Sequence, residues 1–209
     1  MTDRDLKTLE EALRQSAPLA DDDEAVGAAA AVAGRADDAG VLDVAYGTLD
    51  TPLGKMLVAT TGRGLVRIGL PNADADSVIE RVAREVSPRV MELPRRTDVA
   101  RRELDEYFGG GRKEFDLSID WSMVHGDFAR RLLRGLPRVR YGETISYSEA
   151  ARRAGSPRAH RAAGNALASN PLAIVVPCHR VIRSGGDLGG YGGGPDMKEE
   201  LLRMEGFLD

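Results

Sequence analysis

One cysteine occurs in the 209 residues of this chain, and a histidine follows it directly. Cys178 and His179 lie in the run AIVVPCHRVI (173–182), with apolar residues on both sides. A cysteine attacks as its thiolate, and a neighbouring imidazole can take up the thiol proton, directly or through a water. The pair therefore indicates a cysteine nucleophile with a histidine base, whereas a lone cysteine is by itself more often a buried structural residue.

The adjacency of these two residues limits the backbone that can carry them. In a regular strand, neighbouring side chains point to opposite faces, so Cys178 and His179 could not meet. We therefore expect a turn at Pro177-Cys178-His179, or a water that bridges the two groups. A third residue should orient the imidazole, and the natural source is an acidic residue of the helix predicted over 196–206.

A glycine-rich segment, SGGDLGGYGGG (184–194), follows the cysteine and contains seven glycines around Tyr191. Glycines leave the backbone amides open to a ligand, but the Lys-Ser/Thr ending of a phosphate-binding loop is absent. We expect a mobile lid that carries one stacking ring. Plain disorder is the alternative.

The charge of the chain is unevenly distributed. The whole chain has a net charge of −4, yet residues 128–186 contain eleven arginines against two glutamates and no lysine, a net charge of +9. A basic patch in an acidic protein indicates a polyanionic partner, and the alternative is an ordinary solvated surface.

Composition excludes several classes of protein. No run of eighteen apolar residues exists, and the acidic N-terminus is unlike a signal peptide, so we expect no membrane association. A single cysteine cannot form an internal disulfide, which fits the reducing cytoplasm. One cysteine and three dispersed histidines also argue against a metal site.

The first 120 residues show two kinds of pattern. Leucines at helical spacing predict a helix over 3–15, and the polar, alanine-rich segment 17–40 indicates a flexible or weakly helical linker. Alternation of apolar and polar residues with turn signals predicts three antiparallel strands over 43–70. Helices are expected over 75–87 and 97–108, and the run 115–119 is expected to be extended.

Helical patterns dominate the remainder. We expect a helix with Asp127 as its N-cap, which Pro137 should end or kink. A second helix should start from Ser146, with Glu149 at capping-box spacing, and end at Gly155.

A third helix should begin at Ser156, with Pro157 at its first position. Two short helices joined by a glycine-containing turn form a helix-turn-helix pattern, in which an arginine among small residues could approach a groove closely. The alternative is that the alanines and glycine only allow tight packing between helices.

Several of these motifs together resemble the O6-alkylguanine-DNA alkyltransferases. The family's order and spacing are matched by YGETISY (141–147), RAAGNALASNP (161–171), PCHRVI (177–182) and KEELLRMEG (198–206). Two segments nearer the N-terminus resemble the family's N-terminal domain: TPLGKMLVAT (51–60) and YFGGGRKEFDL (107–117). The resemblance covers roughly residues 43–207.

The resemblance implies a fold and a reaction. Residues 43–120 would form an α/β domain with a small antiparallel sheet, and residues 121–209 a mainly α-helical DNA-binding domain with a winged-helix-like helix-turn-helix. Residues 1–42 would be an extension made of a helix and a flexible acidic linker. An alkyl group would move irreversibly from O6-alkylguanine, and from O4-alkylthymine, to Cys178. The protein would use no cofactor or metal and would act once, as a monomer on double-stranded DNA in the cytoplasm and on the nucleoid.

The resemblance also implies roles for individual residues. Cys178 would be the nucleophile, His179 the base acting through a water, Glu205 the residue that orients His179, and Asn170 the amide that holds the turn presenting Cys178. Arg161 would fill the gap in the DNA stack, and Tyr147 would contact the phosphate and the flipped base. Other DNA or substrate contacts would come from Ala162, Gly164, Arg180, Val181, Tyr191 and Gly192.

The chain departs from the family pattern at Pro137, at Arg140, and at Gly190 and Gly192 beside the lid tyrosine, which bears on substrate range. Three other functions stay open at this point. A relative of the same fold could bind alkylated DNA without repairing it, but such relatives have tryptophan in place of the cysteine. A Cys-His hydrolase would need an oxyanion hole, and a transcriptional regulator would use the helix-turn-helix alone.

Overall fold

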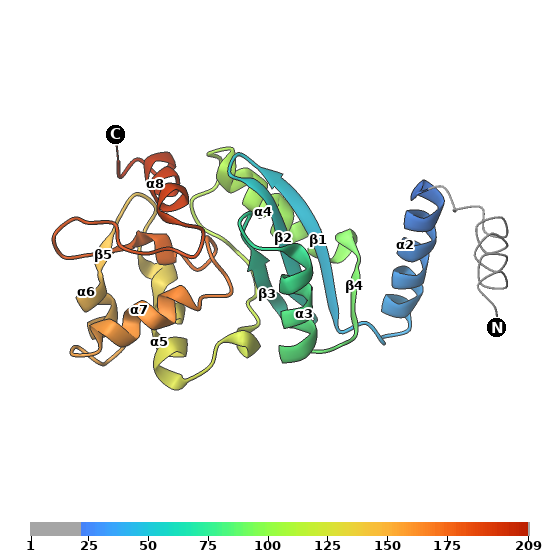
Figure 1. Cartoon of the computed structure of the whole chain (residues 1–209), viewed down its shortest axis with the longest axis horizontal. Coiled ribbons are helices and arrows are strands. Elements are labelled where there is room, and N and C mark those ends of the chain that lie inside the picture. Colours follow the sequence, from blue (N-terminus) through green and yellow to red (C-terminus); the bar gives the residue numbers. More distant parts are fainter. Residues whose placement is uncertain (1–21, 209) are drawn as a thin grey trace, which may run out of the picture. The chain divides into compact units, whose positions relative to one another are not determined.

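The computed structural model describes residues 22–208 (Figure 1), so the helix predicted over 3–15 lies outside the described residues. Residues Asp22–Asp38 form one continuous helix, α2, where composition indicates a flexible or weakly helical linker. The reason is the run of alanines, since alanine has the highest intrinsic helix propensity. Contacts divide the chain after Val41, and residues 42–209 form one unit. No helix within 22–208 is both long enough and apolar enough to cross a membrane.

The first half of this unit is built on a four-stranded mixed sheet. The predicted antiparallel strands are present as β1 (Val44–Thr51), β2 (Gly54–Thr61) and β3 (Gly64–Gly69). A fourth strand, β4 (Val90–Glu92), pairs with β1 in parallel, and the strand order is β3-β2-β1-β4. The sequence prediction missed β4 because three residues are too few to show an alternating pattern.

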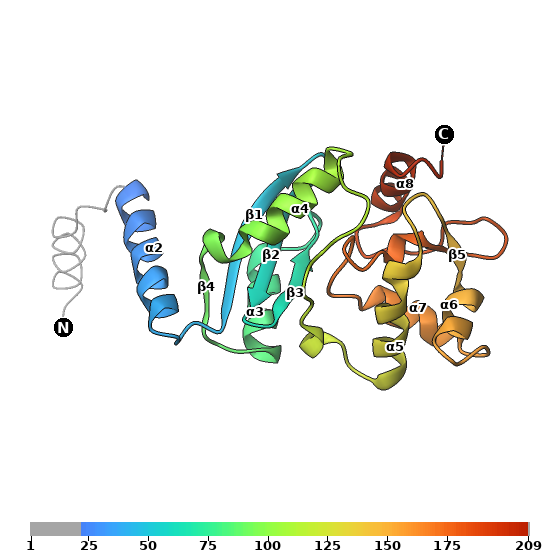
Figure 2. The same cartoon turned by 180° about the vertical axis from the view of Figure 1, so that it is seen from behind.

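Two helices cover opposite faces of the sheet, as Figures 1 and 2 show: α3 (Ala75–Glu85) on one and α4 (Asp98–Phe108) on the other. Alternate residues of β2 point to opposite faces, so they enter two different cores. Val58 packs in one core with Tyr107 of α4, whereas Leu57 packs in the other with Val78 of α3. Asp74 caps α3 by accepting from the Ser77 amide.

The second half is mainly helical, which confirms the predicted combination of an α/β domain and a helical domain. Its helices are α5 (Asp127–Gly135), α6 (Tyr147–Arg153), α7 (His160–Ala168) and α8 (Pro195–Met204). Between them lies a short parallel pair, β5 (Ile145–Ser146) and β6 (Val181–Ile182). Short 3₁₀ turns occur at η1 (Pro94–Thr97), η2 (Trp121–Met123), η3 (Leu136–Arg138) and η4 (Cys178–Arg180).

Helix α5 begins one residue earlier than the cap prediction implies. Gly126, at φ 84°, is the N-cap, and Asp127 is the first helical residue, where its negative charge suits the positive end of the helix dipole. Pro137 was predicted to end or kink this helix; α5 ends at Gly135, and Pro137 lies in η3 directly after it.

Helix α6 has the predicted start, since Ser146 Oγ accepts from the amide of Glu149 at 3.1 Å. The Glu149 carboxylate does not reach back to complete a capping box, because it pairs with Arg152 and Arg153. Gly155, at φ 79°, follows the helix as predicted.

The predicted start of α7 at Ser156 is wrong. The Ser156 amide donates to Ala151 O at 2.9 Å and the Gly155 amide to Arg152 O at 3.0 Å, which is the hydrogen-bond pattern of a Schellman cap. Ser156 therefore ends α6. A separate turn follows, closed by the Ala159 amide on Ser156 O, and α7 begins at His160.

The outer edge of β3 joins the two halves of the unit. Leu65 exchanges backbone hydrogen bonds with Ser118 and Asp120, so the segment predicted to be extended lies beside β3. Further along, the Ile68 amide donates to Pro171 O at 2.8 Å. The sheet thus contacts the segment that leads to Cys178.

Candidate active site

Cys178 lies in a tight turn that its neighbours hold in place. The chain turns at Pro177 and enters η4, as predicted, and Cys178 is only 6% exposed. The Asn170 side chain accepts from the Leu172 amide at 3.1 Å and donates to Val176 O at 2.8 Å. It therefore links the two ends of the loop before the cysteine, which is the place that the predicted role of Asn170 requires.

The surroundings of Cys178 favour its neutral thiol. Burial raises the pKa of the Cys178 thiol, and a hydrogen bond from Asn170 and the positive charge of Lys198 oppose this only in part. A base is therefore needed to generate the thiolate that reacts.

His179 has the geometry of such a base. The imidazole is fully buried, and its Nε2 lies 3.0 Å from Glu205 Oε1. Burial lowers the pKa of His179 despite the attraction of Glu205, so the ring is neutral. With Nε2 donating to the carboxylate, Nδ1 carries the lone pair, and this buried Nδ1 has no hydrogen-bond partner within residues 22–208.

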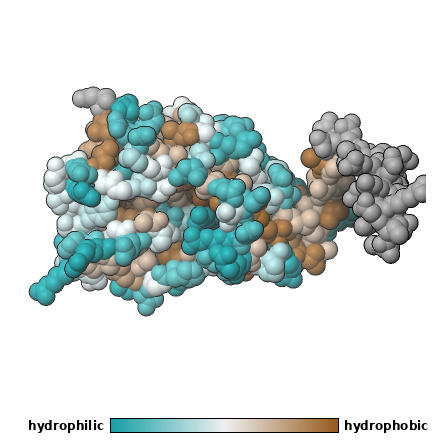
Figure 3. All heavy atoms as spheres, viewed as in Figure 1, coloured by the Kyte–Doolittle hydropathy of each residue, from teal (hydrophilic) through white to brown (hydrophobic). Residues whose placement is uncertain are grey.

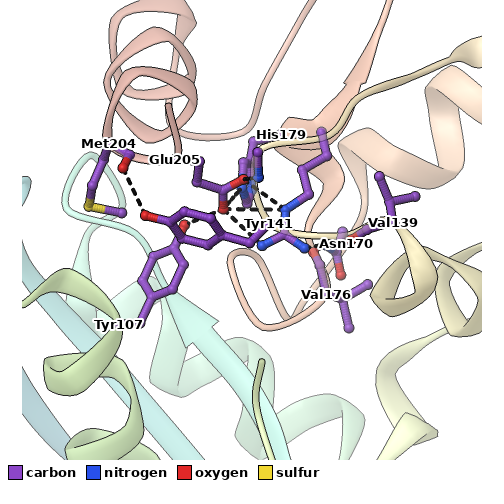
Figure 4. A network of polar contacts seen from close by, with 10 residues as sticks. Tyr107, Val139, Tyr141, Asn170, Val176, His179, Met204 and Glu205 are labelled. Carbon is purple, nitrogen blue, oxygen red and sulfur yellow. Dashed lines mark hydrogen bonds and ion pairs between the residues drawn. The ribbon is translucent and has the colours of Figure 1, made fainter. Parts of the chain in front are cut away.

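Glu205 follows α8 and is its C-cap residue. Its Oε1 accepts from His179 at 3.0 Å, from Arg180 Nη2 at 2.8 Å and from Tyr107 Oη at 2.7 Å (Figure 4). Burial alone would raise the pKa of this carboxyl, but the hydrogen bonds from His179 and Arg180 outweigh burial and lower it to about 2. Glu205 is therefore an anion at neutral pH.

Arg180 is buried and paired within the protein, which speaks against the contact with DNA that the sequence predicted. Its side chain is buried, its Nε and Nη2 donate to Glu205, and its Nη1 donates to Val139 O at 2.7 Å. A guanidinium matches a carboxylate with two parallel hydrogen bonds, so the buried ion pair uses the donors that DNA would need.

Lys198 of α8 is a residue that the sequence prediction missed. Its ammonium is fully buried and donates to the carbonyl oxygens of Val181 at 2.6 Å, Leu188 and Gly190 at 3.4 Å. Burial lowers the pKa of Lys198 to about 8, and the charge of Cys178 acts in the opposite direction. A signal was available, because Lys198 shares the apolar face of α8 with Leu201.

The contacts with Leu188 and Gly190 anchor the glycine-rich loop to α8, and the contact with Val181 ties α8 to β6. A third contact to the loop comes from the N-terminal half, where Asn72 Nδ2 donates to Gly192 O at 3.0 Å. The loop is thus held at defined points, and the alternative of plain disorder is not supported. Gly189 is required where the loop passes Tyr147, since its φ is 71° and an added Cβ would lie 2.8 Å from the tyrosine hydroxyl.

Cys178 borders a cavity of about 230 Å³. Four other residues predicted for the site also line it: Tyr147, Gly164, Tyr191 and Gly192. The ring of Tyr191 meets that of His179 edge-on at 6.3 Å, and its buried hydroxyl has no hydrogen-bond partner within the described part of the chain. The cavity beside Cys178 is therefore lined by two tyrosines, by glycines and by apolar residues of α7.

A second, more open cavity of about 550 Å³ adjoins the first, since Tyr147, Gly164 and Gly190 line both. Its remaining lining includes Arg161 and Arg183, so it is basic. Hydrophilic side chains project from the end of the unit where α6 and α7 meet (Figure 3).

Two predicted residues lie apart from these cavities. Ala162 is exposed on α7 and lines neither cavity. The carbonyl of Val181 already accepts from Lys198, which leaves one lone pair for a ligand. Within residues 22–208, no three His, Cys, Asp or Glu side chains come together as metal ligands would.

Comparison with known proteins gives two family matches that together span most of the described unit. Residues 44–121 match the "6-O-methylguanine DNA methyltransferase, ribonuclease-like domain", and residues 127–207 match the "6-O-methylguanine DNA methyltransferase, DNA binding domain".

Individual relatives agree with these matches. The chain is 41% identical over 162 residues to a methylated-DNA–protein-cysteine methyltransferase of Mycolicibacterium paratuberculosis, covering 78% of this chain and 92% of the relative. The corresponding protein of Methanosarcina barkeri is 37% identical, with 77% and 96% covered. A crystal structure of Mycobacterium tuberculosis OGT in complex with DNA is similar with a TM-score of 0.67 at 37% identity, covering 77% of this chain and 92% of that one.

Proposed function

Since the chain belongs to the methylated-DNA–protein-cysteine methyltransferase family, we propose that Cys178 is the residue that receives the alkyl group. A member of this family is a DNA-binding repair enzyme that transfers an alkyl group from DNA to a cysteine of a protein. The observation that carries the proposal is the position of Cys178, the chain's one cysteine, on a cavity beside the buried His179–Glu205 pair.

Activation of the sulfur begins at His179. Its Nδ1 takes the thiol proton, directly or through a water, and the anionic Glu205 stabilises the imidazolium that forms. The buried ammonium of Lys198 favours the negative charge on sulfur. Asn170 keeps the turn in the geometry that presents the sulfur to the cavity.

The transfer itself exchanges one bond for another. An electron pair of the thiolate forms the S–C bond, and the C–O6 bond breaks with its electron pair going to guanine. The guanine takes up one proton, which balances the proton that left the thiol. The thioether has no route back to a thiolate, so each molecule acts once. O4-alkylthymine presents the same alkyl–oxygen bond and would react likewise.

The target atom is inaccessible in a duplex, so the damaged nucleotide must rotate out of the stack, which requires a few kcal/mol. Tyr147 and Tyr191 would hold the everted base in the inner cavity, and Arg161 would fill the gap it leaves. Small residues of α7, Ala162 and Gly164, would let the helix approach the minor groove. Contacts between arginines and phosphates would offset the remaining free energy without reading sequence.

The partner we propose is double-stranded DNA that contains O6-alkylguanine, bound by a monomer in the cytoplasm and on the nucleoid. Membership of the family argues against the hydrolase and the regulator. The presence of Cys178, rather than tryptophan, argues against a protein that only recognises the lesion.

The test is peptide mass spectrometry after incubation with methylated duplex DNA. We expect one added methyl mass on the peptide that contains Cys178, and none in Cys178→Ser. An unmodified Cys178 peptide, with methyl found on another residue or left on the DNA, would refute the assignment.

A further inference from the structure

The hydroxyl of Tyr107 reaches the carboxylate that holds His179, although Tyr107 belongs to α4 of the N-terminal half. Its ring is fully buried, and its hydroxyl donates to Glu205 Oε1 at 2.7 Å. Figure 4 shows this hydroxyl directed at the carboxylate from the side opposite His179. No step of the proposed alkyl transfer uses this hydroxyl.

Oε1 of Glu205 thus accepts from three donors of different charge: neutral Tyr107, neutral His179 and cationic Arg180. A hydrogen bond to an ionised acceptor away from water is roughly twice as strong as one between neutral groups. Burial and the neighbouring Glu205 raise the pKa of Tyr107 far above its ordinary value, so its hydroxyl donates throughout the working pH range.

The position of Tyr107 is itself fixed by its neighbours. Its ring meets Phe108 at 5.3 Å, Phe115 at 5.3 Å and Tyr141 at 6.1 Å between centroids. Aromatic contacts of this kind hold a buried ring in one orientation. The hydroxyl is therefore a rigid donor that the N-terminal half supplies to the catalytic carboxylate.

We propose that Tyr107 is a positioning residue for alkyl transfer, through which the N-terminal domain sets the orientation and basicity of His179. The inference rests on the proposed function of Cys178 and His179. By fixing Oε1, Tyr107 keeps the imidazole Nε2–H on the carboxylate and leaves Nδ1 for the thiol proton. By sharing the negative charge, it weakens the attraction of Glu205 for a proton on the ring, which helps to keep His179 neutral.

The variant Tyr107→Phe removes only the hydroxyl. Glu205 then has one donor fewer and stabilises a protonated imidazole more strongly, so the pKa of His179 rises, by up to about one pH unit. A protonated ring cannot accept the thiol proton. We therefore expect alkyl transfer from methylated duplex DNA to slow a few-fold at neutral pH and up to about tenfold at low pH, where the ring is largely protonated in both proteins.

Tyr141→Phe is the matched control. Its hydroxyl donates to Met204 O at 2.8 Å, one residue before Glu205, but does not contact the carboxylate. Both variants lose one tyrosine hydroxyl near the end of α8, so a purely structural effect would be similar in both. The measurements are the single-turnover rate per folded molecule and the titration of His179 by NMR with ¹⁵N-labelled histidine.

Tyr107→Phe should show both the slower transfer rate and a higher pKa of His179, and Tyr141→Phe should show neither. An unmoved His179 titration in Tyr107→Phe, or a rate per folded molecule equal to the wild type's, would overturn the inference. The wild-type protein measured alongside reports on the proposed function separately, because it becomes methylated at Cys178 whether or not Tyr107 matters.

Discussion

Replacement of Glu205 by glutamine tests whether a buried anion organises this centre. The Glu205 side chain is fully buried, and the Arg180 side chain beside it is 5% exposed, so water cannot solvate either charge if the pair is broken. The variant keeps the size of the side chain but leaves the Arg180 cation without its partner. Breaking a buried ion pair in this way typically costs about 3–5 kcal/mol of unfolding free energy.

The lowered pKa of Glu205 gives a second value for the stabilisation that the anion contributes to folding, and it shows how that stabilisation depends on pH. Its ordinary value is 4.5 and its folded value is about 2, which at about 1.4 kcal/mol per pH unit corresponds to about 3 kcal/mol. Because the folded pKa is the lower one, this stabilisation is complete above pH 4.5 and is lost as the pH falls towards 2. The deficit of Glu205→Gln relative to wild type should therefore be about 3 kcal/mol at pH 7 and less than half of that by pH 3.

The assay is urea unfolding of both proteins at several pH values between 7 and 3. Glu149→Gln is the matched control, because the pKa of Glu149 is also lowered to about 2 by Arg152 and Arg153, yet this carboxylate lies on the surface. Solvent screens such a pair, so its deficit should be much smaller. A Glu205→Gln deficit that is absent, or that is the same at pH 3 as at pH 7, would refute the role of the buried anion.

Three further results are expected. Lys198→Met should slow alkyl transfer roughly tenfold and move the alkaline rise of Cys178 reactivity with iodoacetamide to higher pH, since one cation near the thiolate is lost; an unchanged iodoacetamide profile would count against this. Arg161→Ala should slow repair of duplex DNA roughly tenfold but leave the reaction with free O6-methylguanine unchanged, and equal slowing of both would remove its stacking role. DNA affinity should fall with salt, with a log–log slope of about −0.9 per phosphate contacted, and a flat response would contradict binding through the arginine-rich surface.

The sequence predicts those features of the site that depend on neighbouring residues or on a short motif. The pairing of Cys178 with His179 requires a turn, and η4 provides it; Glu205 comes from the helix from which an orienting acid was expected. Asn170 bonds the loop before the cysteine and Tyr147 lines the cavity that Cys178 borders, while their roles in the reaction stay predictions. Such residues are recognisable because their types and spacing are unusual in an ordinary helix or strand.

The sequence does not predict the hydrogen-bond and ion-pair partners of side chains that meet only in the folded protein. Arg180 follows a predicted catalytic residue in a basic region, so DNA was the obvious partner, yet the fold places the carboxylate of Glu205 within its reach. The helical pattern of α8 could have shown that Lys198 is buried, but not that Lys198 and Asn72 donate to carbonyl oxygens of the glycine-rich loop. Tyr107 lies 98 residues from Glu205, and no local pattern could join them.

The start of α7 was predicted wrongly because of the residues next to it in the sequence. Ser156 followed by Pro157 is typical of a helix start, but Gly155 at positive φ lets the Ser156 amide complete the end of α6 instead. Two caps competed for one residue, and the cap with two backbone hydrogen bonds was favoured.

The most direct test of the account is the stoichiometry of transfer. Increasing amounts of methylated duplex DNA are added to a fixed amount of protein, and the methyl groups bound per chain are counted by intact mass. We expect the count to stop at one per chain, with no further repair of the remaining DNA. Continued removal of methyl groups beyond one per chain, or a plateau that Cys178→Ser also reaches, would contradict a single acceptor sulfur at Cys178.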